Sequence, residues 1–301
     1  MVEWWQSYRK GAAMLRFHIY DVFTTTPFTG NPLAIVEGAD GLTVAQMQAI
    51  ARQFNLSETI FVQRPDDPAH TAKVRIFFPT AEIPFAGHPT IGCALHLAGE
   101  AGTDVTLEEQ AGLVPVTITR DGPHALAEFT APKLPTRHAP VPPHAMIAAA
   151  LGITAARIGP HDPGVWQGGP AFLYVPVTDL ATLARAQPQE PAWSDLMRAA
   201  DVDSAYLYTQ TPDGIRARMF SPGAGIPEDP ATGSATAILA GQLLAQGGLA
   251  DGTTVISLTQ GVEMGRPATL RLSIDCAMGA ISAIRVAGSA VKIAQGQIRI
   301  P

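Results

Sequence analysis

Apolar and polar residues alternate in several short segments of the chain, whereas other segments carry apolar residues at helical spacing. Residues 15–23 alternate and predict a strand, and an apolar run at 32–37 predicts a second strand after an intervening loop. Residues 43–54 carry apolar side chains three or four positions apart, which predicts a helix with one buried face and Thr43 as its cap. The chain therefore begins with both kinds of element.

The same two patterns continue to the end of the chain. In the first part they predict strands at 58–63, 73–78, 105–108, 113–119 and 125–130 and a buried helix at 91–97. In the second part they predict helices at 144–151, 180–186, 193–200 and 235–246, and strands at 171–177, 205–209, 215–220, 254–259, 268–274, 280–286 and 291–300. The predicted fold class is therefore α/β.

One proline-rich segment predicts a domain boundary. A chain of 301 residues has the length of about two domains. Five prolines lie within residues 131–143, where they remove backbone donors and stiffen the chain. We therefore predict domains at 14–133 and 134–301. Residues 1–13 precede the first strand pattern and a second methionine, Met14, and we leave them out of the fold prediction.

Composition and charge exclude several classes of protein. The chain is 47% hydrophobic and 15% charged, which excludes charge-driven disorder. The net charge of -6 and the lack of basic runs with interleaved aromatics argue against a nucleic-acid partner. No segment has the roughly 18 uninterrupted apolar residues of a membrane span, and the first residues lack the apolar core of a secretory signal. We predict a cytoplasmic protein that does not bind membranes.

The residues that usually bind metals and nucleotides do not form recognisable motifs. Cys93 and Cys276 are too few for a disulfide framework or a thiolate zinc site. The eight histidines are scattered, and the most suggestive pair, His88 and His96, is eight residues apart. Neither a G-x-G-x-x-G motif after a strand nor a Walker loop occurs. A zinc hydrolase and a nucleotide-binding protein are therefore disfavoured.

A weak internal repeat is the most informative feature. Each copy has Phe-x-Pro, then Ile-Pro, then a polar residue before Pro and small residues. The copies are Phe77-Phe-Pro79, Ile83-Pro84 and His88-Pro-Thr-Ile-Gly92-Cys-Ala94, against Phe220-Ser-Pro222, Ile226-Pro227 and Asp229-Pro-Ala-Thr-Gly233-Ser-Ala235. Proline in a first turn and Asp as a cap are typical of helix starts. Two related halves built in this way would direct two helix N-termini into one cleft, where they would hold a carboxylate.

His88 and Asp229 occupy equivalent positions of the two copies and are therefore candidate functional residues. Taken singly, an Asp before a helix is more often a cap, and a lone His is more often an ordinary core or surface residue. Glu58 is a third candidate, at the junction between a helix end and a strand, where a carboxylate can project from a rigid element. By itself, Glu58 is better explained as a solvated loop residue.

Together with these residues, five ordered motifs give the chain a resemblance to the PhzF-like family, named for a phenazine biosynthesis isomerase. The motifs are Asp21-Val-Phe-Thr with Phe28-Thr-Gly-Asn-Pro-Leu-Ala34, Leu56-Ser-Glu-Thr59, Phe85-Ala-Gly-His-Pro-Thr90, Glu228-Asp-Pro-Ala-Thr-Gly-Ser-Ala235 and Gln260-Gly-Val-Glu-Met-Gly-Arg-Pro267. The resemblance runs from about residue 15 to the end. It implies the diaminopimelate-epimerase-like fold: two pseudo-symmetric domains, each a curved, mostly antiparallel sheet wrapped around a central helix.

The resemblance also implies an activity and a set of roles. It implies an isomerase, independent of metal and cofactor, that moves a proton between carbons of a small carboxylated metabolite in the cleft between the domains. A homodimer is implied by the family alone. The implied residues are Glu58 as acid/base, His88 and Asp229 as hydrogen-bonding and relay partners, Gly233 and Ser234 as the grip on the substrate carboxylate, and Asn31, Ser57 and Gly87 as further substrate-binding positions.

Two alternatives stay open from the sequence. Related folds resemble this one but use two opposed cysteines for racemisation or epimerisation of amino or hydroxy acids. Here His88 and Asp229 stand at those helix starts, so a two-thiol racemase is disfavoured and both cysteines are interpreted as structural. A non-catalytic protein that binds a small acid or another protein on the same fold is the second alternative, because fold does not imply function.

Overall fold

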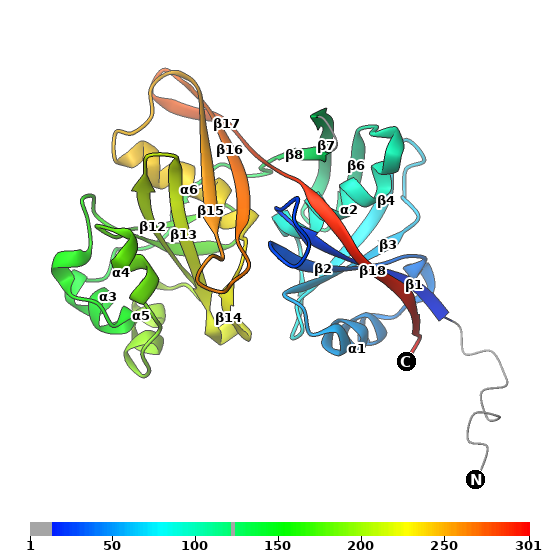
Figure 1. Cartoon of the computed structure of the whole chain (residues 1–301), viewed down its shortest axis with the longest axis horizontal. Helices are drawn as coiled ribbons and strands as arrows, with labels where there is room; N and C mark the ends of the chain where they lie inside the picture. The colour runs from blue at the N-terminus through cyan, green and yellow to red at the C-terminus, as the bar shows by residue number, and fades with distance from the viewer. Residues whose placement is uncertain (1–13, 122–123) are drawn as a thin grey trace, which may run out of the picture.

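The computed structural model describes residues 14–121 and 124–301, which form two lobes (Figure 1). Residues 1–13, which we left out of the fold prediction, lie outside the described residues. Within the described residues the fold is a mixed α/β structure, mostly strands, with six α-helices. No helix in these residues is long and apolar enough to cross a membrane.

The N-terminal lobe takes its strands and two helices from the first part of the chain. Its strands are β1 (Met14–Val22), β2 (Asn31–Val36), β3 (Glu58–Gln63), β4 (Ala72–Phe77), β5 (Glu82–Ile83), β6 (Val105–Glu109), β7 (Gly112–Asp121) and β8 (His124–Thr130). Its helices are α1 (Val44–Phe54) and α2 (Gly87–Ala98). The predicted cap of α1 is confirmed, because the Thr43 hydroxyl accepts from the Gln46 amide while the Gln46 side chain bonds the Thr43 backbone.

The second part of the chain forms the other lobe and then returns to the first. Its strands are β9 (Thr136–Arg137), β10 (Gly164–Gln167), β11 (Ala171–Pro176), β12 (Ala205–Thr211), β13 (Gly214–Ser221), β14 (Ile226–Asp229), β15 (Gly252–Gln260), β16 (Ala268–Ala277), β17 (Ala280–Gly288) and β18 (Ala290–Arg299). Its helices are α3 (His144–Leu151), α4 (Leu180–Arg185), α5 (Ala192–Ala200) and α6 (Gly233–Ala245). The sequence patterns missed the short strands β5, β9, β10 and β14.

The two lobes repeat one order of strand pairing. In the first, β2 pairs parallel with β3 and β4 pairs parallel with β6. In the second, β11 pairs parallel with β12 and β13 pairs parallel with β15. The other pairings are antiparallel, and β8 pairs with β17 to join the two lobes. The corresponding crossovers contain α2 in one lobe and α6 in the other, so the weak sequence repeat reflects a repeated architecture.

The last strand leaves its own lobe. β18 crosses over and pairs along its length with β1, as the red strand over the blue lobe in Figure 1 shows. The end of the chain therefore completes the sheet of the N-terminal lobe. The division into domains 14–133 and 134–301 stays a prediction. In the structure, β18 belongs to the second range of residues but pairs with a strand of the first.

The central helices begin earlier than their apolar patterns predicted. α2 begins at Gly87 and α6 at Gly233, because glycine and proline positions that resemble loops form the first turns. The interpretation of Asp229 as a helix cap is wrong: Asp229 ends β14, and Thr232 is the N-cap residue of α6. Residues 230–232 connect β14 to α6, and residues 84–86 make the corresponding connection from β5 to α2.

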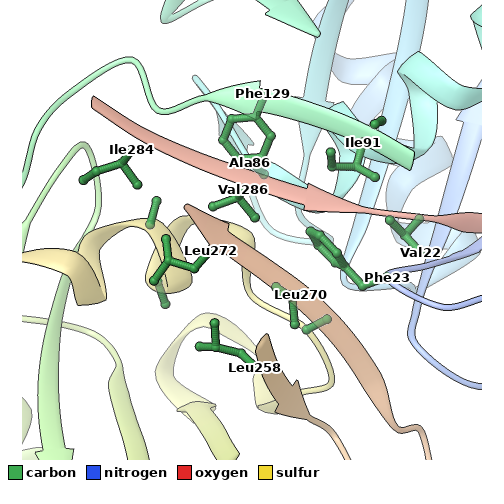
Figure 2. Close-up of a cluster of buried hydrophobic side chains, with 14 of the residues drawn as sticks. Val22, Phe23, Ala86, Ile91, Phe129, Leu258, Leu270, Leu272, Ile284 and Val286 are labelled. Carbon is green, nitrogen blue, oxygen red and sulfur yellow. The ribbon is translucent and has the colours of Figure 1, made fainter. Parts of the chain in front are cut away.

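One apolar core runs through both lobes. Figure 2 shows Phe129 of β8 and Val286 of β17 close to Leu272 of β16, and the same cluster includes Phe23 and Ile91. Smaller clusters lie under α1 and among α3, α4 and α5. Because the large cluster includes residues from both lobes, burial of apolar surface favours their docked arrangement.

The two central helices touch at their first residues. A Cβ atom added to Gly87 would lie 2.9 Å from the Cα of Gly233, and one added to Gly233 would lie 3.1 Å from the Cα of Gly87. Phe129 packs against the first glycine and Phe23 against the second. Only residues without a side chain fit this close approach of two backbones.

A buried carboxyl ties β6 to α2. Glu109 is 7% exposed, and its Oε1 accepts a hydrogen bond of 2.7 Å from the Thr90 hydroxyl, while its Oε2 has no partner among the described residues. Burial raises the pKa of Glu109 to about 8. The folded protein therefore holds a proton on Glu109 at neutral pH.

We expect Gly87→Ala to destabilise the fold by about 1–3 kcal/mol, because the added methyl group meets backbone that cannot rotate away. Urea unfolding gives the change in the free energy of unfolding. Gly41→Ala is the matched control, since a Cβ atom at Gly41 would meet nothing within 4 Å, and it should change that free energy by less than about 0.5 kcal/mol. Equal effects of the two substitutions would contradict the close approach.

We expect Glu109→Gln to remove a pH dependence of stability. The pKa of Glu109 is about 8 in the folded state against 4.5 ordinarily, so its contribution is fully present below pH 4.5 and is lost as pH rises through 8. The variant should match the wild type at pH 5 and be more stable at pH 9, by on the order of a few kcal/mol. Urea unfolding at both pH values measures this, and a difference that does not change with pH would refute it.

Candidate active site

The candidate residues of the N-terminal lobe come from adjacent element starts. Asn31 begins β2 and Glu58 begins β3, and the parallel register that pairs Leu33 with Glu58 brings these two starts together. His88 is the second residue of α2, at the same edge. Asp229 reaches this group from β14 of the other lobe. The fold thus gathers the three sequence-predicted candidates in one region.

Asp229 is bound by donors from both lobes. Its Oδ1 accepts from the Asn31 amide at 2.8 Å and from the Ser57 hydroxyl at 3.3 Å, and its Oδ2 accepts from the Thr232 hydroxyl at 2.5 Å. The Asn31 amide also donates to the carbonyl of Ala231 at 2.9 Å. Asp229 is 5% exposed and Asn31 is fully buried, so these bonds stabilise the contact between the lobes away from water.

Glu58 and His88 form a second contact inside the N-terminal lobe. The Oε2 of Glu58 lies 3.2 Å from the Nδ1 of His88 and has no regular hydrogen bond within the described residues. The Asn31 amide lies 3.4 Å from the same Nδ1, but both of its hydrogens already point to Asp229 and Ala231. A hydrogen bond between Glu58 Oε2 and His88 Nδ1 therefore requires a proton on one of these two atoms.

Burial sets the charge states of the two groups. It lowers the pKa of His88 to about 3, so the imidazole is neutral at physiological pH. Burial, together with the negative charge of Asp229, raises the pKa of Glu58 well above its ordinary value. The neutral imidazole therefore faces a carboxyl group that retains its proton more readily than an exposed glutamate does.

Asp229 is also affected by burial, which raises its pKa, whereas the hydrogen bonds from Thr232, Asn31 and Ser57 lower it. Three buried atoms of the site remain without regular partners in the described part of the chain: Asn31 Oδ1, Glu58 Oε2 and His88 Nε2. The carbonyl of Pro32 lies close enough to His88 to raise its pKa slightly without meeting hydrogen-bond geometry. Unpaired buried polar atoms concentrated in one place are typical of a functional site.

A cavity of about 790 Å³ opens beside this group, between the lobes. Glu58, Asp229 and Ser234 line it, whereas Asn31, Ser57, Gly87, His88 and Gly233 do not. Asn31 and Gly87, which the resemblance placed along the cleft, instead support it from behind, because Asn31 bonds Asp229 and Gly87 packs on Gly233. The volume is that of a small-molecule site.

The start of α6 at the cavity suits an anion. No side chain of the described residues caps either α2 or α6. α6 begins Gly233-Ser234-Ala235 and offers three free N–H groups, whereas the third residue of α2 is Pro89, which has none. Because Ser234 lines the cavity, the stronger of the two helix N-termini points its partial positive charge there.

Sequence reasoning missed several residues of the site. Gln260 is fully buried, and its amide donates to the Asp229 carbonyl at 2.7 Å and to the Thr232 hydroxyl at 2.9 Å, which fixes the segment between β14 and α6. Gln260 opens one of the five family motifs, but no local pattern in the sequence indicated that it holds this segment. Phe85 and Phe172 form apolar walls, and Lys133 is a cation at the cavity. No chain pattern identifies such wall residues before the fold is known.

The two cysteines do not form an opposed pair at the cavity. Cys93 is buried in α2 and Cys276 lies in β16, and neither is among the described residues that line the cavity. Burial raises the pKa of the Cys93 thiol, which makes it a poor base. Both thiols are free. The site chemistry therefore rests on carboxylates, an imidazole and backbone amides.

The chain is similar to known proteins along nearly all of its length. Residues 20–296 match the phenazine biosynthesis-like protein family, PhzC-PhzF. An uncharacterised isomerase of Mesorhizobium japonicum is 41% identical, over 94% of this chain and 98% of that protein. The trans-2,3-dihydro-3-hydroxyanthranilate isomerase of Pseudomonas aeruginosa is 35% identical, over 94% of this chain and 99% of that enzyme.

Two solved structures share the fold of this chain. The PhzF-family phenazine biosynthesis protein of Bacillus anthracis superposes with a TM-score of 0.85 at 24% identity, covering 96% of this chain and all of that one. A hydroxyproline epimerase of Agrobacterium vitis, covering 95% and 91% of the two chains, has a TM-score of 0.64 at 14% identity and shares the fold alone. The chain therefore belongs to the phenazine biosynthesis-like PhzC-PhzF family and is an isomerase.

Proposed function

We propose that the chain moves a proton between two carbons of a small carboxylated metabolite, with Glu58 as the acid/base. The observation that carries this is the position of Glu58: it lines the cavity, is 7% exposed, and lies 3.2 Å from a buried imidazole. A base that abstracts a proton from carbon needs a raised pKa, and burial and Asp229 provide it.

The proposed step uses a single recycling base. The Glu58 carboxylate takes a proton from one carbon of the substrate, and the electron pair delocalises into the adjacent unsaturated system. The same carboxyl group then returns the proton to another carbon, so the product is an isomer and the enzyme is regenerated. Neutral His88 supports this cycle because its lone pair can accept a hydrogen bond from protonated Glu58 and release it when the proton leaves.

The substrate carboxylate is proposed to bind at the start of α6, where the N–H groups of Gly233 and Ser234 are free of side-chain caps. The apolar walls, including Phe85 and Phe172, suit the carbon skeleton. We propose that the lobes correspond to two pseudo-symmetric epimerase-like domains and that the substrate lies between them. The homodimer stays a prediction.

A racemase or epimerase of amino or hydroxy acids is the second candidate, favoured by the fold shared with the hydroxyproline epimerase. It would need two opposed acid/base groups across the cavity. The cavity offers Glu58 and Asp229, and the charge of Asp229 is close enough to raise the pKa of Glu58, so the two groups do not form a pair on opposite faces. The single-base isomerisation therefore fits the geometry better.

We expect the wild type to incorporate deuterium from heavy water at a carbon of its substrate, and Glu58→Gln to lose this exchange by about 10²–10⁴-fold. The first probe is trans-2,3-dihydro-3-hydroxyanthranilate, the compound named for the Pseudomonas aeruginosa relative, followed by other small unsaturated carboxylic acids. Mass spectrometry and proton NMR measure the exchange.

The matched control is Glu109→Gln, which also replaces a buried carboxyl of the N-terminal lobe but does not touch the cavity. It should retain wild-type exchange. If Glu58→Gln, shown by calorimetry to bind the probe, exchanges as fast as the wild type, the proposed role of Glu58 is wrong.

We expect Asp229→Asn to move the acid limb of the pH profile of kcat/KM to lower pH, by about one pH unit. The negative charge of Asp229 raises the pKa of Glu58, so its removal lets the Glu58 carboxylate form in more acidic solution. Asp203→Asn, at another cavity carboxylate, is the control and should leave the limb in place. An unshifted limb in Asp229→Asn would show that Asp229 does not act on Glu58 through charge.

A further inference from the structure

Three potential metal ligands meet at the end of α2 opposite the catalytic candidates. His18 lies on β1, Glu37 follows β2, and His96 is in the last turn of α2. Their ligand atoms all lie within 4.8 Å of one another. The Oε1 of Glu37 is 2.7 Å from the Nε2 of His96 and 3.3 Å from the Nε2 of His18. Two imidazole nitrogens thus converge on one carboxylate oxygen.

The two imidazoles of this cluster are nearly buried, whereas its carboxylate is more exposed to solvent. The side chains of His18 and His96 are each 12% exposed, and their rings lie 4.4 Å apart between centroids. Glu37 is 33% exposed, which leaves a path from solvent. The Nδ1 of His18 is buried and has no partner among the described residues. Both rings are therefore held with their Nε2 atoms directed at the carboxylate before any ligand binds.

A neighbouring hydroxyl fixes the ring of His96. The Tyr20 hydroxyl lies 3.1 Å from the Nδ1 of His96 and can accept a hydrogen bond from it. The Nε2 of His96 lies 2.7 Å from the Oε1 of Glu37, so a proton lies between them in the metal-free protein. A cation would replace this proton, and Nδ1 would then donate to the Tyr20 hydroxyl, as metal-binding histidines do to their outer-shell partners. The C-terminal end of α2 adds partial negative charge. The positive charge of Lys292 is close enough to His18 to lower the pKa of its imidazole and would repel a cation. The Lys292 ammonium donates a hydrogen bond of 2.6 Å to the Gln295 side chain.

We propose that His18, Glu37 and His96 bind one divalent transition-metal ion of the zinc class. Two imidazole nitrogens and one carboxylate oxygen are ligands that such ions prefer, with water completing the coordination. Metal bonds of about 2.0–2.2 Å would separate the ligand atoms by roughly 3.4 Å. Glu37 and His18 are already 3.3 Å apart, and Glu37 and His96 would move apart from 2.7 Å.

This site is separate from the cavity. His96 follows His88 by eight residues along α2, which corresponds to about 12 Å along the helix axis. A bound ion would join β1, the end of β2 and α2, and would thereby fix the helix whose other end presents His88. The proposal does not depend on the proposed isomerisation. Sequence spacing did not predict it, because the three ligands come from three separate elements.

The test is metal binding to the full chain after treatment with a chelator. Titration calorimetry with Zn²⁺ should show one equivalent bound, and Co²⁺ should give a visible absorption band that Zn²⁺ displaces. Glu37→Gln, which keeps the shape of the side chain, should lower the affinity by more than about 100-fold. Tyr20→Phe should lower it by about 10–100-fold, as loss of an outer-shell partner does.

His70→Gln is the matched control. His70 and Glu108 form another imidazole–carboxylate pair, with Nδ1 and Oε1 2.7 Å apart, but no third ligand of the described residues completes it. This variant should bind Zn²⁺ as the wild type does. Circular dichroism verifies folding, and His96→Gln replaces Glu37→Gln if the latter unfolds. Absence of saturable binding in the wild type, or binding that persists in both variants at the cluster, would overturn the proposal.

Discussion

The contact between Gly87 and Gly233 is the constraint on which the site depends. Two helix N-termini can meet backbone to backbone only where both residues lack a side chain, and this meeting fixes the position of one lobe against the other. His88 follows the first glycine and Ser234 the second, so the imidazole and the free amides at the start of α6 are positioned by the same contact. A side chain at either glycine would separate His88 from the start of α6.

Hydrogen bonds between the lobes also hold them in the arrangement that the two glycines allow. Asn31 uses both amide hydrogens on the C-terminal half, one on Asp229 and one on Ala231. Arg266 of the C-terminal half donates across the same boundary: its guanidinium bonds Asp21 and the carbonyl of Gly30 in the N-terminal lobe. Because β18 also returns to pair with β1, each lobe is completed by the other half.

The sequence predicted much of this arrangement, because the signals it carried were local. The capping pattern at Thr43, the strand at 58–63 and the two apolar central helices all follow from short-range spacing. The repeat identified His88 and Asp229, although Asp229 ends a strand rather than capping a helix. Gln260 and the apolar walls were not predictable, since their roles depend on contacts between residues far apart in the chain.

The unequal hydrogen bonding of the two carboxyl groups explains which of them carries the proton. Asp229 and Glu58 are both buried, and each would be more stable protonated if it stood alone. Asp229 accepts hydrogen bonds from Asn31, Ser57 and Thr232, which stabilise its ionised form. No hydrogen bond from a described residue lowers the pKa of Glu58, so the shared negative charge resides on Asp229 and the proton on Glu58. Of the two carboxyl groups that line the cavity, Glu58 is thus the one with the greater proton affinity.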